Sequence, residues 1–195
     1  MQADAVAEKR YPEDVTFVLV PGLRDHVEEH WQTYLQKELP RAVTVPPLER
    51  DKLSRAARVN ALVETLEGVQ GDVVLVAHSA GSITTVHWAM QSTRPVRGAL
   101  LATPSNLAEQ LPQGYPSLED LQANGWNPIP RSPLPFPTIV AASRNDPLAR
   151  FEWAEKMAAD WGARLADLGE VGHLNPASGF GRWSGVHALL QELVA

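Results

Sequence analysis

Cysteine is absent from the 195 residues of this sequence. That absence excludes disulfides, thiolate nucleophiles and cysteine-based zinc sites, and it leaves the redox compartment undecided. Long apolar runs are missing too, because none approaches the roughly 20 residues that a membrane-spanning helix needs. The first residues, MQADAVAEKRYPED, lack the apolar core of a signal peptide. We therefore expect a soluble cytoplasmic protein with no membrane partner.

Positive charge is also in short supply. The chain has 17 Lys and Arg against 23 Asp and Glu, which gives a net charge of -6 and a pI near 5.5. Without a basic surplus to offset phosphates, a nucleic-acid partner is not expected. The length suits one domain with a substantial core, spanning residues 1–195, with residues 1–14 as a flexible N-terminal segment.

Apolar runs and amphipathic stretches alternate along the chain. Strands are predicted at 15–20, 42–45, 73–77, 96–102, 137–142 and 164–168, and helices at 28–39, 51–66, from 80 onward, 147–161 and 183–194. Asp51 is expected to cap the second of these helices, and Pro147 to open the fourth. Six strands joined by helical crossovers predict an α/β fold, a doubly wound parallel sheet with helices on both faces.

The run DVVLVAHSAGSITTVHWAM, residues 72–90, joins a buried strand to a helix through A-H-S-A-G. This resembles the G-x-S-x-G nucleophile elbow, a sharp turn that holds a serine at the carboxyl end of the sheet. Ala77 replaces the usual first glycine, and its single methyl group can fit. Ser79 is thus a candidate nucleophile. The alternative is that Ser79 only caps the following helix.

Two further polar residues follow later strands. Asp146 comes directly after the fifth predicted strand, and His173 lies in the glycine-rich loop after the sixth. Active sites of open α/β sheets lie along the carboxyl edge, and the order serine, acid, histidine is that of the α/β-hydrolases. We predict a triad of Ser79, Asp146 and His173, with Asp146 rather than Asp167 or Asp25 as the acid. The alternatives are a simple Asp-Pro turn and a surface histidine.

Acyl transfer also needs hydrogen-bond donors for the oxyanion. The elbow would supply the N–H of Ala80, and the loop after the first strand would supply a second donor. We choose the Leu23 N–H, with Gly22 giving the backbone room to turn. The alternative is that Pro21-Gly22 is merely a turn.

Residues 103–136 contain seven prolines, which forbid a long helix there. We expect an irregular loop over the carboxyl edge, with one short helix near 118–123, and we expect it to line the substrate pocket. The candidate pocket walls are Leu107, Trp126, Phe136 and, from near the last helix, Trp183.

Residues 26–30 offer a rival interpretation. They read H-V-E-E-H, which matches the inverted zinc-protease motif through His26, Glu29 and His30. The match begins in a predicted loop, and no downstream helix offers a clear third ligand. We favour a structural role for His30, and we expect neither a metal nor another cofactor.

Four stretches together resemble a known family: VPGLRDHVEEHWQ, VLVAHSAGS, PLPFPTIVAASRNDP and WGARLADLGEVGHLNPASGFGRW. They look like the compact serine hydrolases of the retinoblastoma-binding-protein and YdeN type, over nearly the whole chain. The resemblance implies a minimal α/β-hydrolase that lacks two leading strands of larger relatives. It also carries the triad over to Ser79, Asp146 and His173.

The sequence thus predicts a cofactor-independent, esterase-like serine hydrolase that acts on a small-molecule acyl substrate, an ester, a thioester or an amide. The alternative from another class is a binding protein that kept the fold and lost turnover.

Overall fold

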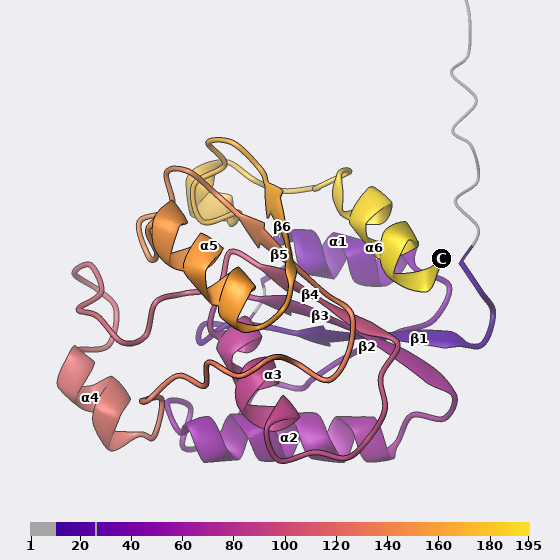
Figure 1. Cartoon of the computed structure of the whole chain (residues 1–195), viewed down its shortest axis with the longest axis horizontal. Helices are drawn as coiled ribbons and strands as arrows, with labels where there is room; N and C mark the ends of the chain where they lie inside the picture. The colour runs from indigo at the N-terminus through magenta and orange to yellow at the C-terminus, as the bar shows by residue number, and fades with distance from the viewer. Residues whose placement is uncertain (1–10, 26) are drawn as a thin grey trace, which may run out of the picture.

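The computed structural model describes residues 11–25 and 27–195. Its sheet contains six strands in the order β2-β1-β3-β4-β5-β6, and every neighbouring pair is parallel. The strands are β1 (Val15–Val20), β2 (Ala42–Thr44), β3 (Asp72–His78), β4 (Gly98–Ala102), β5 (Thr138–Ala142) and β6 (Arg164–Asp167). The predicted six-stranded parallel sheet is confirmed (Figure 1).

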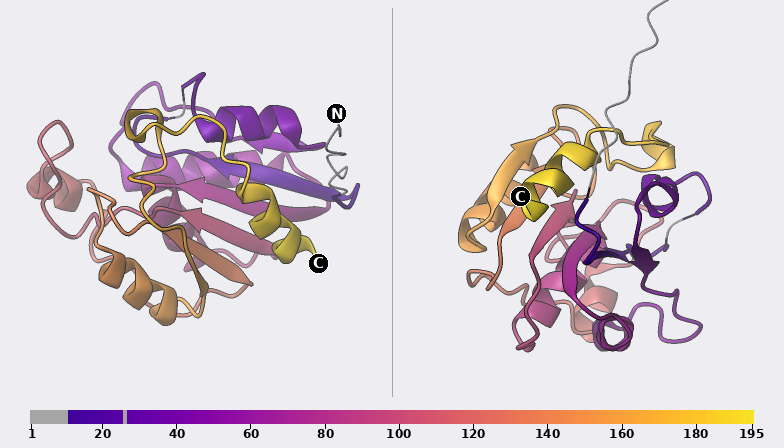
Figure 2. Two further views of the ribbon diagram at one scale, coloured as in Figure 1. Left: turned by 90° about the horizontal axis from the view of Figure 1, so that it is seen from above. Right: turned by 90° about the vertical axis from the view of Figure 1, so that its right-hand side faces the viewer.

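Helices cover both faces of this sheet. They are α1 (Trp31–Glu38), α2 (Arg55–Glu67), α3 (Ala80–Ala89), α4 (Leu118–Ala123), α5 (Phe151–Asp160), the 3-10 helix η1 (Pro176–Ser178) and α6 (Val186–Val194). The α1 and α6 helices pack in one apolar cluster, and α2, α3 and α5 pack in the other. Figure 2 (right) shows α1 and α2 nearly end-on, on opposite sides of the sheet.

The central strands explain the apolar runs of the sequence. Every residue of β1, β4 and β5 is buried, as is β3 from Val73 onward, whereas the edge strands β2 and β6 are partly exposed. Strands covered on both faces need apolar side chains at successive positions rather than at alternate ones. The carboxyl ends of the strands point toward the side of the molecule where α4 lies (Figure 1).

Several helices begin later than predicted. The α1 helix starts at Trp31 because His30 is its N-cap, with the His30 ring accepting from the Gln32 N–H. The α5 helix starts at Phe151 rather than at Pro147. Residues 147–150 form a loop instead of the expected first helical turn, and the Leu148 N–H there donates to the Asp146 carboxylate.

The cap of α2 is also different. Ser54, not Asp51, precedes the helix and accepts from the Ala57 N–H at 3.2 Å. Asp51 instead forms a turn in which its carbonyl accepts from the Ser54 N–H, and it has a φ of 51°. The last helix, α6, begins at Val186 rather than near Trp183, after a turn in which the Val186 N–H donates to the Trp183 carbonyl.

Tyr11, the first residue that the structure describes, packs against the sheet. Residues 1–10 of the segment expected to be flexible lie outside the described residues, but Tyr11 is buried, and its ring meets Phe17 edge-on at 4.9 Å. Its hydroxyl lies 2.8 Å from His187 Nδ1. Burial raises the pKa of Tyr11 to about 12, with a smaller contribution from Glu38. Tyr11 therefore joins the start of the described chain to α6.

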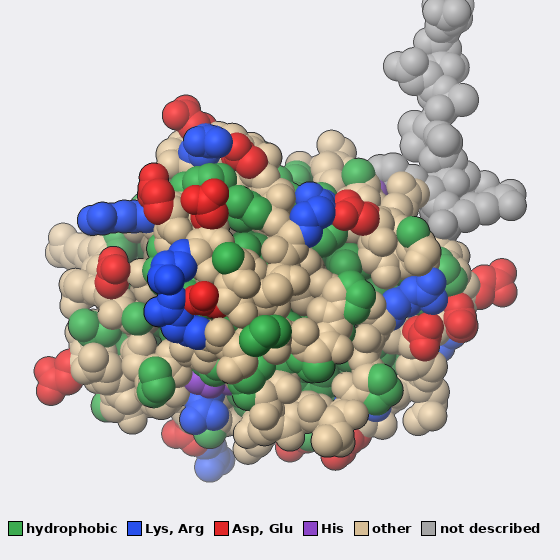
Figure 3. All heavy atoms as spheres, viewed as in Figure 1, with side chains coloured by type: hydrophobic (Ala, Val, Ile, Leu, Met, Phe, Trp, Pro, Cys, Tyr) green, Lys and Arg blue, Asp and Glu red, His purple; other side chains and the backbone are tan. Residues whose placement is uncertain are grey.

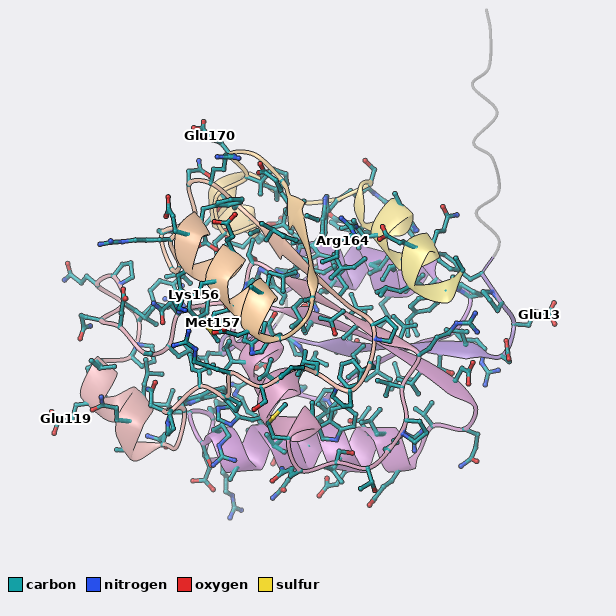
Figure 4. All side chains as sticks on the ribbon, in the orientation of Figure 1. Glu13, Glu119, Lys156, Met157, Arg164 and Glu170 are labelled. Atoms are coloured by element: carbon teal, nitrogen blue, oxygen red, sulfur yellow. The ribbon has the colours of Figure 1, made fainter. Side chains whose placement is uncertain are left out.

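Charged side chains of both signs are intermixed over the face shown in Figure 3. Glu119 of α4 and Glu170 of the loop after β6 project outward from the periphery in Figure 4. Among the described helices, none is long and apolar enough to cross a membrane.

Candidate active site

A cavity of about 210 Å³ opens at the carboxyl edge of the sheet. The loops after β1, β3, β4, β5 and β6 all contribute to it, through Leu23, Ser79, Ser105, Leu148 and His173 among others. Ligand sites of open α/β sheets are found at this edge. The predicted location of the site therefore coincides with a real cavity.

Ser79 occupies the turn between β3 and α3 and has a φ of 59° and a ψ of -128°. A positive φ is costly for a residue with a Cβ, and such strain persists only where the surroundings impose it. Ser79 stands at the N-cap position of α3, but its side chain makes no capping hydrogen bond, so capping is not the role of its hydroxyl. Ser79 is partly exposed while His78 and Ala80 are buried, so the turn presents its hydroxyl to the cavity.

Two glycines permit this turn. A Cβ on Gly81 would lie 2.2 Å from the Val20 carbonyl oxygen, so only glycine lets α3 pass this close to the end of β1. A Cβ on Gly22 would lie 3.0 Å from Ser79 Cβ and 3.3 Å from its Oγ. The loop after β1 thus runs in contact with the Ser79 side chain.

Ser79, His173 and Asp146 form a continuous hydrogen-bonded chain. His173 Nε2 lies 2.8 Å from Ser79 Oγ, and His173 Nδ1 lies 2.9 and 3.0 Å from the two carboxylate oxygens of Asp146. The side chains of His173 and Asp146 are 4% and 3% exposed. Since a carboxylate can only accept, Nδ1 carries the proton and Nε2 accepts from the Ser79 hydroxyl. This arrangement can remove a proton from Ser79.

The two other candidate acids have different partners. Asp167 forms an exposed ion pair with Arg144 at 2.6 Å, and the hydrogen bond from Arg144 lowers the pKa of Asp167. Asp25 lies 3.6 Å from the Arg58 guanidinium. Of the three carboxylates, Asp146 is the one that contacts His173.

Hydrogen bonds between the loops after β5 and β6 hold Asp146 beside His173. Asn145 Oδ1 accepts from the Gly172 N–H at 2.6 Å, and Ser143 Oγ accepts from the Val171 N–H at 3.2 Å. These bonds come from residues that stand just before the acid and just before the histidine in the chain. The relative position of the two loops is therefore fixed by side chains rather than by strand pairing alone.

His78 contacts the backbone and the ring of His173. Its Nε2 donates to the His173 backbone carbonyl at 2.9 Å, and the two rings are 5.0 Å apart. Complete burial lowers the pKa of His78 well below its ordinary value, and the nearby His173 and His30 lower it further. His78 is thus a neutral donor that fixes the backbone of His173.

Arg58 holds the loop on the other side of Ser79. Its guanidinium donates to the carbonyls of Gly22 at 3.0 Å, Leu23 at 2.9 Å and Lys52 at 2.8 Å. Burial lowers the pKa of Arg58, although Asp25 opposes the shift. Because carbonyl and N–H point in opposite directions across a trans peptide, a held Gly22 carbonyl turns the Leu23 N–H away from Arg58.

The pocket walls differ from those predicted. Leu107 lines the cavity, but Trp126, Phe136 and Trp183 do not. Trp126 is fully buried, with its Nε1 donating to the Leu53 carbonyl. Phe136 packs on Trp88, and Trp183 packs edge-on against Trp31. Each of these rings packs against the apolar clusters of the protein instead.

The first part of the proline-rich segment supplies the cavity walls instead. Leu111 and Tyr115 of this segment line the cavity together with Leu107, as do Pro176 and Ala177 of η1. Arg24 joins the loop after β1 to this segment: it donates to the Gly114 carbonyl at 2.8 Å, and its guanidinium lies 4.2 Å from the centre of the Tyr115 ring. The predicted short helix is present as α4, which does not contribute to the cavity.

Ser105 is a member of the site that the sequence analysis missed. Its Oγ lies 2.9 Å from Ser79 Oγ, and the residue is 1% exposed. It stands three residues after the end of β4, at the same sheet edge as Asp146 and His173. That position is a signal that could have identified it.

The zinc interpretation receives no support from the described residues. Within residues 11–25 and 27–195, no three His, Cys, Asp or Glu side chains are close enough to hold a metal ion. His26 lies outside the described residues. The His30 ring caps α1 and stacks edge-on with His78 at 4.7 Å, and Glu29 is exposed.

Known proteins resemble this chain in sequence and in fold. Residues 17–192 match the serine hydrolase family. A protein described as a YdeN-like hydrolase from Pectobacterium atrosepticum is 30% identical, over 94% of each chain, with a TM-score of 0.78. No curated protein sequence matches the chain significantly.

More distant structures agree in fold alone. The YdeN protein of B. subtilis is 18% identical, over 92% of this chain and 98% of that one, with a TM-score of 0.70. Est1E from Butyrivibrio proteoclasticus, with ferulic acid bound, is 11% identical over 94% and 91%, also with a TM-score of 0.70. The family match and the six-stranded parallel sheet lead to one conclusion: the chain belongs to the serine hydrolase family and has the α/β-hydrolase fold.

Proposed function

We propose that this protein hydrolyses carboxylic esters, thioesters or amides through an acyl-enzyme formed on Ser79. The observation that carries the proposal is the unbroken chain from Ser79 Oγ through His173 to Asp146, with contacts of 2.8 and 2.9 Å. The chain ends in a cavity at the carboxyl edge of the sheet. No other serine of the described residues combines an elbow turn with a histidine contact.

In the first half-reaction, Ser79 Oγ attacks the acyl carbon while its proton passes to His173 Nε2. The electron pair of the carbonyl double bond moves onto the oxygen, which gives a tetrahedral oxyanion. Collapse expels the leaving group, which takes the proton from Nε2. Asp146 keeps the proton on Nδ1 and stabilises the imidazolium that forms.

In the second half-reaction, water replaces the leaving group. His173 Nε2 removes a proton from the water, whose oxygen attacks the acyl carbon. Collapse of the second tetrahedral intermediate breaks the bond to Ser79 Oγ, and Nε2 returns the proton to that oxygen. The products are the free acid and the original enzyme.

The oxyanion would be bound by the N–H groups of Ala80 and Leu23. Ala80 is the first residue of α3, where N–H groups have no acceptor within the helix and the helix dipole favours negative charge. Leu23 lines the cavity, and its N–H points away from the guanidinium of Arg58, which holds the preceding carbonyl. Both donors are backbone groups set in advance of the reaction, as such stabilisation requires.

The cavity favours a small apolar acyl group. Its volume of about 210 Å³ exceeds the roughly 150 Å³ that is known to admit benzene. Leu107, Leu111, Tyr115 and Leu148 supply its walls. We therefore expect short-chain or benzoyl-sized acyl groups to be cleaved faster than long chains. Est1E, a structural neighbour, binds the aromatic acid ferulic acid, so aromatic acyl groups belong in the test.

A panel of p-nitrophenyl acetate, butyrate, octanoate and benzoate, with one acyl thioester and one feruloyl ester, tests this proposal. We expect hydrolysis that peaks at short or aromatic acyl groups, and single labelling by a fluorophosphonate probe. Ser79→Ala should abolish both. Labelling of the wild type without turnover would indicate a binding protein that retains a reactive serine. Labelling that persists in Ser79→Ala would overturn the assignment of the nucleophile.

A further inference from the structure

Within the part of the chain that the structure describes, Ser105 supplies the one hydroxyl group that contacts Ser79 Oγ. The two oxygens are 2.9 Å apart, and Ser105 lines the same cavity. Among the residues that the structure describes, Ser79 Oγ is the only hydrogen-bond partner of the Ser105 hydroxyl. Ser105 is 1% exposed, so bulk water does not compete for this contact.

The direction of this hydrogen bond follows from the rest of the chain. The N–H at His173 Nδ1 donates to Asp146, so Nε2 accepts the hydrogen bond from the Ser79 hydroxyl. Ser79 has no second proton to offer to Ser105. The Ser105 hydroxyl is therefore the donor and Ser79 Oγ the acceptor.

The backbone around Ser105 holds it in this position. The Thr103 N–H donates to the Ala141 carbonyl at 2.8 Å, and the Asn106 N–H donates to the Leu148 carbonyl at 2.9 Å. Pro104 restricts the chain between these anchors. The donor is thus preorganised by contacts with the end of β5 and the loop that follows it.

We propose that Ser105 is a catalytic hydroxyl that stabilises negative charge on Ser79 Oγ; the inference rests on the function proposed above. When His173 removes the Ser79 proton, Oγ gains negative charge until its bond to the acyl carbon forms. When the acyl-enzyme is hydrolysed, that bond breaks and its electron pair returns to Oγ. The Ser105 O–H donates to this oxygen in both steps and keeps its own proton throughout.

The test compares Ser105→Ala with Ser82→Ala and Ser105→Thr. Ser82 is a fully buried serine on α3 whose hydroxyl has no partner among the described residues. Its replacement by alanine removes a buried hydroxyl and keeps the backbone bond from the Ser82 N–H to the Ser79 carbonyl. We expect Ser105→Ala to lower kcat and the fluorophosphonate labelling rate by about tenfold to a hundredfold, as for a hydrogen bond to a charged group. KM should change less than threefold, and Ser82→Ala should resemble the wild type.

Ser105→Thr retains the hydroxyl and should recover part of the lost rate, provided that its unfolding temperature shows a folded protein. The comparison of the two alanine variants decides the matter even if the threonine does not fit. If the wild type is labelled at Ser79 while Ser105→Ala keeps kcat within threefold of Ser82→Ala, the role of Ser105 is wrong and the proposed function stands. If the wild type is neither labelled nor active on the ester panel, the proposed function itself fails.

Discussion

The two sides of Ser79 are built by different means. On one side, the loops after β5 and β6 bring two side chains, Asp146 and His173, into a hydrogen-bonded chain. On the other side, the proposed contribution of the loop after β1 is a backbone N–H, and Arg58 holds this loop through the carbonyls of Gly22 and Leu23. Chemistry that lies in side chains can be recognised from residue types, whereas chemistry that lies in the backbone depends on what holds the loop.

The largest effect on kcat should come from the loss of Ser79 Oγ, the atom that lies between the two sides of the site. Ser79→Ala leaves both sides in place and removes the nucleophile, and kcat should fall by about 10⁶, as for the serine of a protease triad. The reaction is measured on the best ester of the panel, and circular dichroism and urea unfolding verify the fold. A decrease of less than about a hundredfold would mean that neither side acts on Ser79.

The second largest effect on kcat should come from Asp146, the acid of the hydrogen-bonded chain. Asp146→Asn preserves the volume but favours the wrong tautomer of His173, so kcat should fall by about 10⁴. Asp167→Asn is the matched control, because Asp167 is paired with Arg144 on the surface. It should stay within threefold of the wild type. If Asp146→Asn remains within about tenfold, equal to some 1.4 kcal/mol in barrier, the acid lies elsewhere.

The same division explains how much the sequence could predict. The central strands were predicted because burial on both faces requires apolar runs, as in β1 and β3. Ser79, Asp146 and His173 could be proposed together because each follows a strand. The starts of the helices after Asp51 and Pro147 could not be placed correctly, since turns and tertiary hydrogen bonds decide them.

The backbone half was predicted only in outline. Leu23 and Ala80 could be proposed by their positions, but nothing in a helical segment marks Arg58 as buried rather than solvent-facing. The aromatic residues misled the prediction of pocket walls, because Trp126 is buried in the core and Trp183 packs, partly buried, against Trp31. A single serine in a proline-rich segment, Ser105, carries no signal of its own beyond its place after β4.

A moderate effect on kcat should come from Arg58, which holds the loop after β1 through its carbonyls. Arg58→Met removes the three carbonyl contacts and should lower kcat about tenfold to a hundredfold, up to the cost of losing one oxyanion donor. Arg58→Lys keeps the charge but not the planar fork, so it should recover little. Arg55→Met is the control on the same helix, since Arg55 bonds to the Gly125 carbonyl instead.

Two readouts distinguish an oriented oxyanion donor from general loosening of the loop. A simple alkyl or aryl trifluoromethyl ketone forms a tetrahedral adduct with Ser79, and the oxyanion of this adduct binds the same donors as the reaction intermediate. Its affinity for Arg58→Met should therefore fall in step with kcat. KM for the ester should change much less. If Arg58→Met and Arg55→Met lower kcat equally, the loop after β1 does not depend on this clamp, and the contrast between the two sides disappears.

The smallest effect concerns the support beneath His173, and it appears in stability rather than in rate. The pKa of His78 is held well below its ordinary value by burial, in a cluster with His173, His30 and Trp31. Above about pH 6.5, the pKa of a histidine in the unfolded chain, the His78 ring is neutral in both states. As the pH falls below that value, the unfolded chain takes up a proton that the native protein does not, so the free energy of unfolding decreases.

His78→Gln removes this titration but keeps a donor for the His173 carbonyl. Between pH 7.5 and 5.5, the wild type should therefore lose more stability than the variant, by at most about 1.4 kcal/mol. Urea unfolding at the two pH values measures the difference. Because the glutamine amide can still donate to that carbonyl, kcat at pH 7.5 should change only a few-fold. If His78→Gln leaves the pH dependence of unfolding unchanged, His78 is not the group that titrates. If the variant loses as much kcat as Asp146→Asn, His78 takes part in the reaction itself rather than supporting the backbone of His173.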